Sequence, residues 1–193
     1  MKTGKSLLWT FLVLVFVAAL YRIIPGRPWG FAPQIAMALF GGAVIKEKKW
    51  AFALPVFSMF VSDLLYQVLY KVGVSPIYGF YDGQAWNYAL VALMVVIGFA
   101  IKKINVLQVV LASVAGPFVF FLLSNFITWS GLSGPLRGLN RPLTPAGLLA
   151  AYGDGIPFFE NSVLGTLFFS MVLFGGYYLL GKTETGNAAT VKA

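Results

Sequence analysis

The sequence predicts an all-α, polytopic integral membrane protein with six transmembrane helices. Of its 193 residues, 59% are hydrophobic and only 10% are charged, and the mean hydropathy is +0.83. Soluble domains carry about 25% charged residues, so this composition excludes an ordinary soluble domain, a coiled coil or a disordered protein. We expect a single transmembrane domain over residues 1–182 and a polar, disordered tail over residues 183–193.

Six apolar stretches give the number of helices. In chain order they are Leu7–Ile24, Phe31–Ile45, Ala51–Tyr70, Trp86–Ile101, Val106–Trp129 and Ile156–Leu180. A spanning helix needs about 20 residues, which the third, fifth and sixth stretches provide. The second and fourth are short and would have to extend into flanking polar residues. The first follows Lys2 and Lys5 as a signal peptide would, but it is long and lacks a small-x-small cleavage site. We therefore predict that the first stretch is also a membrane helix.

The basic residues predict the orientation. With the N-terminus inside, the cytoplasmic side holds nine lysines: Lys2, Lys5, Lys46, Lys48, Lys49, Lys102, Lys103, Lys182 and Lys192. The outer side holds five cations: Arg22, Arg27, Lys71, Arg137 and Arg141. Cytoplasmic loops of membrane proteins carry the excess of lysine and arginine. The net charge of +8 is thus an orientation signal rather than a nucleic-acid footprint, and both termini are expected in the cytoplasm of a cell whose inner membrane holds the protein.

The residue types that are missing argue against most catalytic chemistry. The chain has no histidine and no cysteine, so it has no imidazole base, no thiol nucleophile, no disulfide and no His or Cys metal site. Its six acidic residues are scattered and form no motif, and no phosphate-binding glycine loop is present. We expect no catalytic residue, no metal and no cofactor, and hence no enzyme.

The connections between the predicted helices are lopsided. The inner connections Lys46–Trp50 and Lys102–Asn105 are little more than turns. The outer ones are long: Pro25–Gly30, Val72–Ala85 and Ser130–Gly155. Long loops without a function are uncommon in compact domains, so the outer face is where we expect the function to lie. In the last loop, Thr144-Pro145 predicts the start of a short interfacial helix that Gly153 ends.

Asp63 is the only acidic residue well inside a predicted helix, where it lies in the outer half. A charge at the centre of a membrane helix costs about 2.5–3.5 kcal/mol on insertion scales, so such a group usually has a partner inside the bundle. One interpretation is a structural pair with Arg22 or Arg27 that ties the third helix to the first. The other is a ligand or ion contact at the inner end of an outward pocket, and the two are compatible. The same face continues outward with Tyr66, Gln67 and Tyr70.

Amides and aromatic residues gather at the outer ends of three predicted helices: Trp86, Asn87, Asn125, Trp129 and Asn161. The tryptophans alone are typical of the aromatic belt at the headgroup level, which needs no ligand. The amides have no such preference, and aromatic walls with a few polar groups are the usual composition of a ligand site. The segment 76–86 adds further aromatic residues, which would either lie on the bilayer surface or close over a ligand.

Three functional hypotheses follow. In the first, the chain binds a small anionic or aromatic solute at the outer face for uptake. Charge would be recognised by Arg27, Arg137 and Arg141, rings by Trp29, Tyr78, Tyr81, Trp86 and Trp129, and polar groups by Asp63, Gln67, Asn87, Asn125 and Asn161. In the second, the chain is a structural or assembly subunit whose small-residue helix faces dock other membrane proteins. In the third, it is an enzyme acting on lipid, with Asp63, Asp154 or Glu160 as acid or base.

Several motifs also resemble a known family. The run Gly30-Phe31-Ala32-Pro33 leads into a small-residue helix that ends in Gly41-Gly42, and a helix with Ser62-Asp63 follows. This pattern resembles the substrate-binding S-components of energy-coupling-factor transporters. The segments Ser124-Asn125-Phe126 and 156–161 are similar to a family of small bacterial membrane proteins of this transport type. The resemblance covers most of residues 25–175.

The resemblance implies an S-component-like bundle of six helices with an outward-facing, vitamin-sized pocket under the first, third and fifth loops. It also implies vitamin uptake across the bacterial inner membrane, with a transmembrane coupling subunit and ATPases as partners. S-components generally carry Ala-x-x-x-Ala in the first helix for docking on the coupling subunit. Here the first helix has adjacent Ala18-Ala19, so a solitary carrier stays an alternative.

Overall fold

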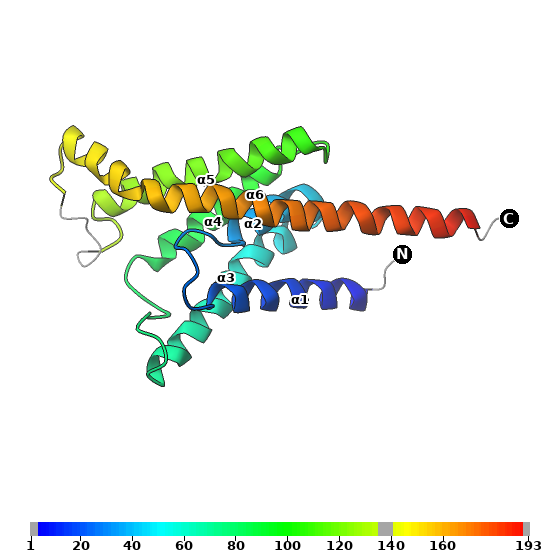
Figure 1. The fold of residues 1–193 in the computed structure, drawn as a ribbon, viewed down its shortest axis with the longest axis horizontal. Helices are drawn as coiled ribbons and strands as arrows, with labels where there is room; N and C mark the ends of the chain where they lie inside the picture. The colour runs from blue at the N-terminus through cyan, green and yellow to red at the C-terminus, as the bar shows by residue number, and fades with distance from the viewer. Residues whose placement is uncertain (1–3, 135–140, 191–193) are drawn as a thin grey trace.

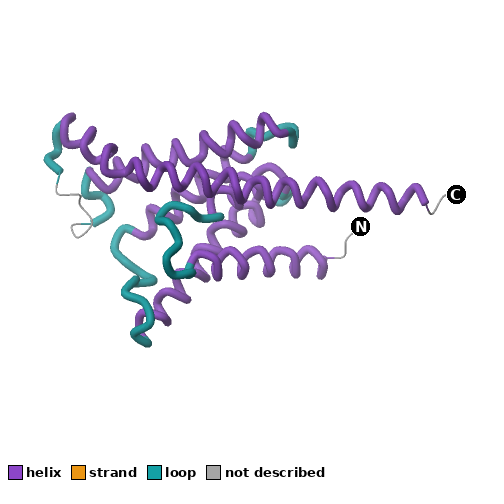
Figure 2. The backbone as a smooth tube through the Cα atoms, in the orientation of Figure 1, coloured by secondary structure: helices purple, strands orange, loops and turns teal. Residues whose placement is uncertain are grey.

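The structure is a computed structural model that describes residues 4–134 and 141–190, with side chains over residues 9–134 and 141–179. The described part of the chain contains six α-helices and no strand, which confirms the predicted all-α class (Figures 1 and 2). The helices are α1 Gly4–Arg22, α2 Gln34–Val44, α3 Lys48–Lys71, α4 Gln84–Gly98, α5 Val106–Trp129 and α6 Pro145–Thr190.

Three of these helices, α3, α5 and the described part of α6 up to Leu179, are long and apolar enough to cross a membrane. They are the three for which the sequence predicted sufficient length. The apolar helices α1, α2 and α4 are shorter over their described side chains, and α2 has only 11 residues. At 1.5 Å per residue α2 is about 16 Å long, which is shorter than a full span. The extension into flanking polar residues that a full span would require is therefore not observed.

The core is built around α2, which contacts α3, α4, α5 and α6. Most of its residues are buried, because its alanines and glycines let other backbones approach closely. A Cβ added to Gly41 would lie 2.8 Å from the Ala51 carbonyl oxygen of α3. A Cβ added to Gly42 would lie 2.9 Å from the backbone of Gly98 in α4. The small residues of α2 are therefore a structural requirement.

The helix α1 lies at the side of the bundle and packs on α3. Val15 and Ala18 of α1 are buried in one cluster with Met37 and Leu54. The other face of α1 exposes large apolar side chains, among them Trp9, Phe16 and Leu20. A helix with apolar residues on its outward face is typical of contact with lipid.

The start of α6 is as predicted, but its continuation is not. It begins at Pro145, and the Thr144 hydroxyl accepts a hydrogen bond from the backbone N–H of Gly147 (3.2 Å). The prediction of a short interfacial helix ended by Gly153 was wrong, because α6 runs on through Gly153 and Pro157. Figure 1 shows the first turns, in yellow, inclined to the long remainder. Pro157 cannot donate to the carbonyl of Gly153, so the predicted break takes the form of a bend.

The helix α6 also includes residues 183–190, where the sequence predicted the beginning of a disordered tail. No proline interrupts the chain after Pro157, so no residue there removes a helical hydrogen bond. Residues 191–193 of the expected tail lie outside the described part.

The long connections gather at one end of the molecule. The connections at residues 23–33 and 72–83 and the described parts of the connection between α5 and α6 lie on the left in Figures 1 and 2. The start of α1 and the end of α6 lie on the right. The short connections 45–47 and 99–105 lie away from the long ones. The end with the long connections holds the candidate site.

Candidate functional site

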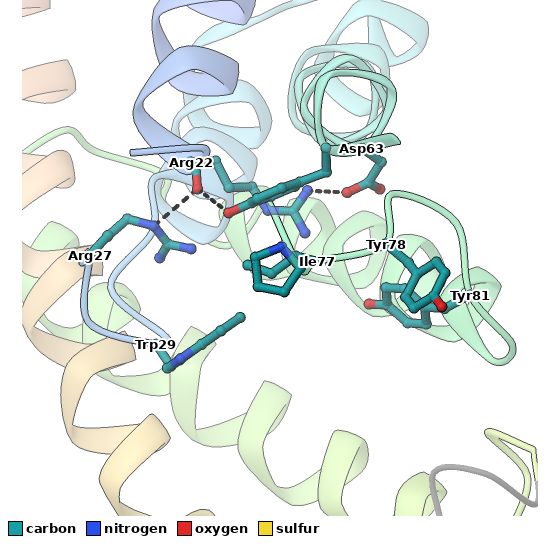
Figure 3. Close-up of a pocket in the computed structure, with 9 residues that line it drawn as sticks. Arg22, Arg27, Trp29, Asp63, Ile77, Tyr78 and Tyr81 are labelled. Atoms are coloured by element: carbon teal, nitrogen blue, oxygen red, sulfur yellow. Dashed lines mark hydrogen bonds and ion pairs between the residues drawn. The ribbon is translucent and has the colours of Figure 1, made fainter. Parts of the chain in front are cut away.

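The centre of the site is a buried ion pair between α1 and α3. Asp63 is 1% exposed, and its Oδ1 accepts a hydrogen bond from Nη1 of Arg22 at 2.5 Å (Figure 3). The same Nη1 also donates to the Ser62 hydroxyl at 2.5 Å. The predicted structural pairing of Asp63 is thus confirmed, with Arg22 and not Arg27 as the partner. It joins the last residue of α1 to the C-terminal half of α3.

The second carboxylate oxygen of Asp63 faces α4. It accepts hydrogen bonds from the side-chain amide of Gln84 and from the hydroxyl of Tyr88 (2.6 Å). Gln84, itself 5% exposed, also donates to the carbonyl of Gly79 at 2.9 Å. The three hydrogen bonds that the Asp63 carboxylate accepts, from Arg22, Gln84 and Tyr88, offset the cost of burying its charge. Asp63 therefore ties three helices and one loop together.

The loop between α3 and α4 lies directly on α3, and Gly79 makes this possible. A Cβ at Gly79 would meet the Asp63 carbonyl, and it would lie 2.6 Å from the backbone nitrogen of Gln67. Gly83, at the end of the loop, has φ = 77°, a left-handed conformation that favours glycine. These two glycines bring the aromatic residues of the loop to the C-terminal end of α1.

A pocket of about 300 Å³ lies between the Arg22–Asp63 pair and these loops. Its lining residues are Arg22, Arg27, Trp29, Asp63, Tyr66, Pro76, Ile77, Tyr78 and Tyr81. In Figure 3, Arg27 and Trp29 lie on one side of the pocket and Tyr78 and Tyr81 on the other. Five of the residues predicted as binding residues are therefore brought together here, four from the loops before α2 and before α4 and Asp63 from α3.

Backbone carbonyls hold Arg27 in place. Its Nε donates to the carbonyl of Arg22 at 3.2 Å, and its Nη1 donates to the carbonyl of Phe31 at 2.6 Å. The Tyr66 hydroxyl donates to the same Arg22 carbonyl at 2.6 Å. Within the described residues, Arg27 has no ion pair with a carboxylate. The lining holds two guanidinium groups and one carboxylate, so its formal charge is 2 − 1 = +1.

A smaller cavity of about 70 Å³, here called the side pocket, shares Tyr81 with the main one. The residues that line it are Tyr81, Gly83, Trp86, Asn87, Leu90, Ser124, Ile127, Thr128 and Ser133. It includes Trp86 and Asn87 from the predicted set. The Asn87 side-chain amide donates to the Tyr81 hydroxyl at 2.8 Å, so α4 fixes the residue that stands between the two cavities.

The remaining predicted residues that the structure describes line neither cavity. Arg141 forms a two-fold hydrogen-bonded pair with Asp154, at 3.0 and 2.9 Å. Three others donate to backbone carbonyls: Asn125 to Phe121 (2.8 Å), Trp129 to Pro142 (3.0 Å) and Asn161 to Trp29 (3.0 Å). Gln67 is half-buried on α3, and Arg137 lies outside the described residues. Asn161 still bears on the pocket, because it links α6 to the backbone of a lining residue.

Residues 2–189 match a family of unknown function, DUF6580. The chain belongs to this family. No curated protein and no solved structure matches the chain. What this DUF6580 protein does must therefore be argued from its own site.

Four residues at the centre of the site were not among the predicted binding residues: Arg22, Tyr66, Gln84 and Tyr88. Arg22 and Tyr66 had been recognised as neighbours of Asp63 but not as pocket residues. The spacing of Gln84 and Tyr88, four residues apart at the start of α4, places both on one helix face and would have been the signal. Together, the groups form a positively charged, aromatic-walled pocket over a fixed ion pair.

Proposed function

We propose that this DUF6580 protein binds a small anionic solute in the main pocket, at the outer face of a membrane that its six helices cross. Both termini are then cytoplasmic, in the inner membrane. The lysine-rich short connections lie away from the long connections (Figure 2), two of which contribute residues to the pocket, and this supports the orientation. The observation that carries the proposal is Arg27, a half-buried guanidinium in the pocket without a carboxylate partner among the described residues.

The charge arrangement favours one anionic group on the ligand. Asp63 already neutralises Arg22, so the second guanidinium is left to balance a carboxylate or phosphate, the groups that arginine recognises best. Trp29 and Tyr78 are more than half exposed at the pocket, where they offer ring faces to an aromatic part of the solute. A volume of about 300 Å³ is at the lower end of the range for ligand sites, about 300–1,000 Å³. A small, vitamin-like metabolite fits these properties.

Uptake is the role that the resemblance to S-components supports. In that role the chain would supply binding, and a coupling subunit with ATPases would supply energy, since the sequence has no nucleotide-binding loop. Binding does not depend on those partners, so the purified chain is sufficient to test it. An assembly subunit would instead bind membrane proteins and leave the pocket without a ligand.

The test uses two probes of nearly equal shape, benzoate and the uncharged benzamide. We expect benzoate to raise the melting temperature of the detergent-purified protein and to bind in calorimetry, and benzamide to do neither. Replacing Arg27 with glutamine should abolish benzoate binding. Lys71→Gln, which removes an exposed outer cation outside the pocket, is the matched control and should keep it. Equal binding of both probes, or full benzoate binding by Arg27→Gln, would contradict the proposal.

A further inference from the structure

The side pocket has unused hydrogen-bonding capacity. Ser133 is 6% exposed, and its buried hydroxyl has no hydrogen-bond partner within the described residues. A buried hydroxyl without a partner costs about 1–3 kcal/mol, so such a group in a cavity wall points to a ligand. Ser133 lies in the turn after α5, where its backbone carbonyl packs against Gly83. The turn therefore holds this hydroxyl against the start of α4.

The neighbouring polar residues of the lining keep acceptor capacity. The hydroxyls of Ser124 and Thr128 donate to carbonyls of their own helix, at 3.4 and 2.9 Å, which leaves lone pairs on both oxygens. Asn87 uses its amide nitrogen for Tyr81, and its carbonyl oxygen accepts no hydrogen bond within the described part of the chain. The cavity thus offers one free donor and several acceptors.

None of the described residues that line the side pocket is charged, in contrast to the main pocket. Placing an ionic group there would remove it from water without a counter-charge, at a cost of several kcal/mol. A neutral group that both donates and accepts, such as a hydroxyl or a carboxamide, can satisfy Ser133 and its neighbours. The volume of about 70 Å³ suits such a substituent rather than a whole solute.

We infer that the side pocket is a second subsite of the same binding site, which takes an uncharged hydroxyl or amide group of the anion held at Arg27. This inference rests on the proposed function. Tyr81 lines both cavities, and its hydrogen bond to Asn87 fixes it as their common wall. The natural ligand then carries an acidic group at one end and a neutral polar group at the other.

The side pocket can be tested without any knowledge of the anion, because the chain contains no cysteine. Ser133→Cys should react with the small uncharged reagent methyl methanethiosulfonate at least 10-fold faster than with its anionic sulfonatoethyl analogue. Both rates are divided by those of Leu132→Cys, the exposed neighbouring position in the same turn. Equal normalised rates, or no reaction with either reagent even after Tyr81→Ala, would show that no accessible neutral subsite exists.

The link to the anion is tested with pairs of probes that differ only in one neutral group. The anions 3- and 4-(hydroxymethyl)benzoate are compared with 3- and 4-ethylbenzoate, which have the same shape and charge. One net hydrogen bond predicts that the better hydroxymethyl isomer binds roughly 3- to 10-fold tighter than its ethyl counterpart. This ratio should fall to near one in Ser133→Ala. It should persist in Ser130→Ala, whose hydroxyl bonds to its own helix outside both cavities.

The two failures can be told apart. If no benzoate binds, the proposed function fails, and the cysteine reaction alone decides whether the neutral cavity exists. If benzoates bind but both ethyl isomers equal or exceed their hydroxymethyl partners, the second subsite is refuted and the anion site remains.

Discussion

At the scale of single residues, Asp63 shows how hydrogen bonds can offset the cost of burying one charge. Its two oxygens accept from Arg22, Gln84 and Tyr88, so both oxygens are hydrogen-bonded before a ligand arrives. This favours a structural role for the carboxylate and leaves recognition of a solute to Arg27. The expectation that Asp63 itself contacts a ligand stays a prediction, since it lines the pocket as well.

Removing this carboxylate should destabilise the fold. Asp63→Asn leaves the Arg22 guanidinium, which is only 17% exposed, without a counter-charge, and we expect a loss of about 3 kcal/mol. Unfolding of the purified protein by heat or denaturant measures it. Glu160→Gln, a change of an exposed acid on α6, should have little effect. The double variant Asp63→Asn, Arg22→Gln should lose less free energy of unfolding than the sum of the two single losses. Strict additivity would argue against the pair.

Gln34 presents the opposite case, a buried amide that nothing in the described structure satisfies. It is 5% exposed in the first turn of α2, and neither its nitrogen nor its oxygen has a hydrogen-bond partner there. We expect Gln34→Met to stabilise the protein by about 1 kcal/mol, because it removes two unpaired polar atoms. Gln67→Met on half-buried α3 surface is the comparison and should change the melting temperature little. A lower melting temperature for Gln34→Met would show that the amide has a partner.

At the scale of elements, the predicted bounds were close for α3 and α5 and far off for α6. The stretch Val106–Trp129 was predicted to the residue, and Ala51–Tyr70 differs from α3 by three residues at its start and one at its end. Continuous hydrophobicity fixes such helices. The break expected at Gly153 fails because a glycine permits a helix end but does not impose one. Whether the helix continues depends on what the following residues pack against.

The close packing of α2 gives an element-scale prediction. A Cβ at Gly42 would meet the backbones of Val95 and Gly98, whereas at Gly176 of α6 it would meet nothing within 4 Å. Gly42→Ala should therefore destabilise the protein by roughly 1–3 kcal/mol through overpacking. Gly176→Ala, the matched change in a helix, should leave stability equal or slightly higher. The account of α2 as the close-packed centre is wrong if the two variants melt alike.

The site was only partly predictable, because contacts between different elements decide which side chains line it. Arg27, Trp29, Tyr78 and Tyr81 were identified from residue type and from their place in outer loops. Arg141, which was predicted to bind an anion, is paired with Asp154 instead of lining a cavity. Nothing in the local sequence indicates this contact between residues 13 positions apart. Gln84 was missed because its spacing of four residues from Tyr88, which places both on one face of α4, was not used. Tertiary contacts, not residue type, decide which polar groups stay available.

At the scale of the whole molecule, the proposed uptake of a solute requires the pocket to face outward. The absence of cysteine from the sequence allows single cysteines to report this directly. Val74→Cys, in the loop after α3 and 72% exposed, should react in intact cells with a thiol reagent that cannot cross membranes. Lys103→Cys, exposed in the connection between α4 and α5, should react only after the membrane is opened. The reverse pattern would place the pocket in the cytoplasm.

The central claim is that the pocket beside Arg27 holds a small anion. Native mass spectrometry of the purified protein tests it most directly, without a choice of probe. We predict one bound molecule of vitamin size, with an acidic group, in the unaltered chain and in Lys71→Gln, and its loss in Arg27→Gln. Bound lipid alone, or a small molecule retained by Arg27→Gln, would contradict the account.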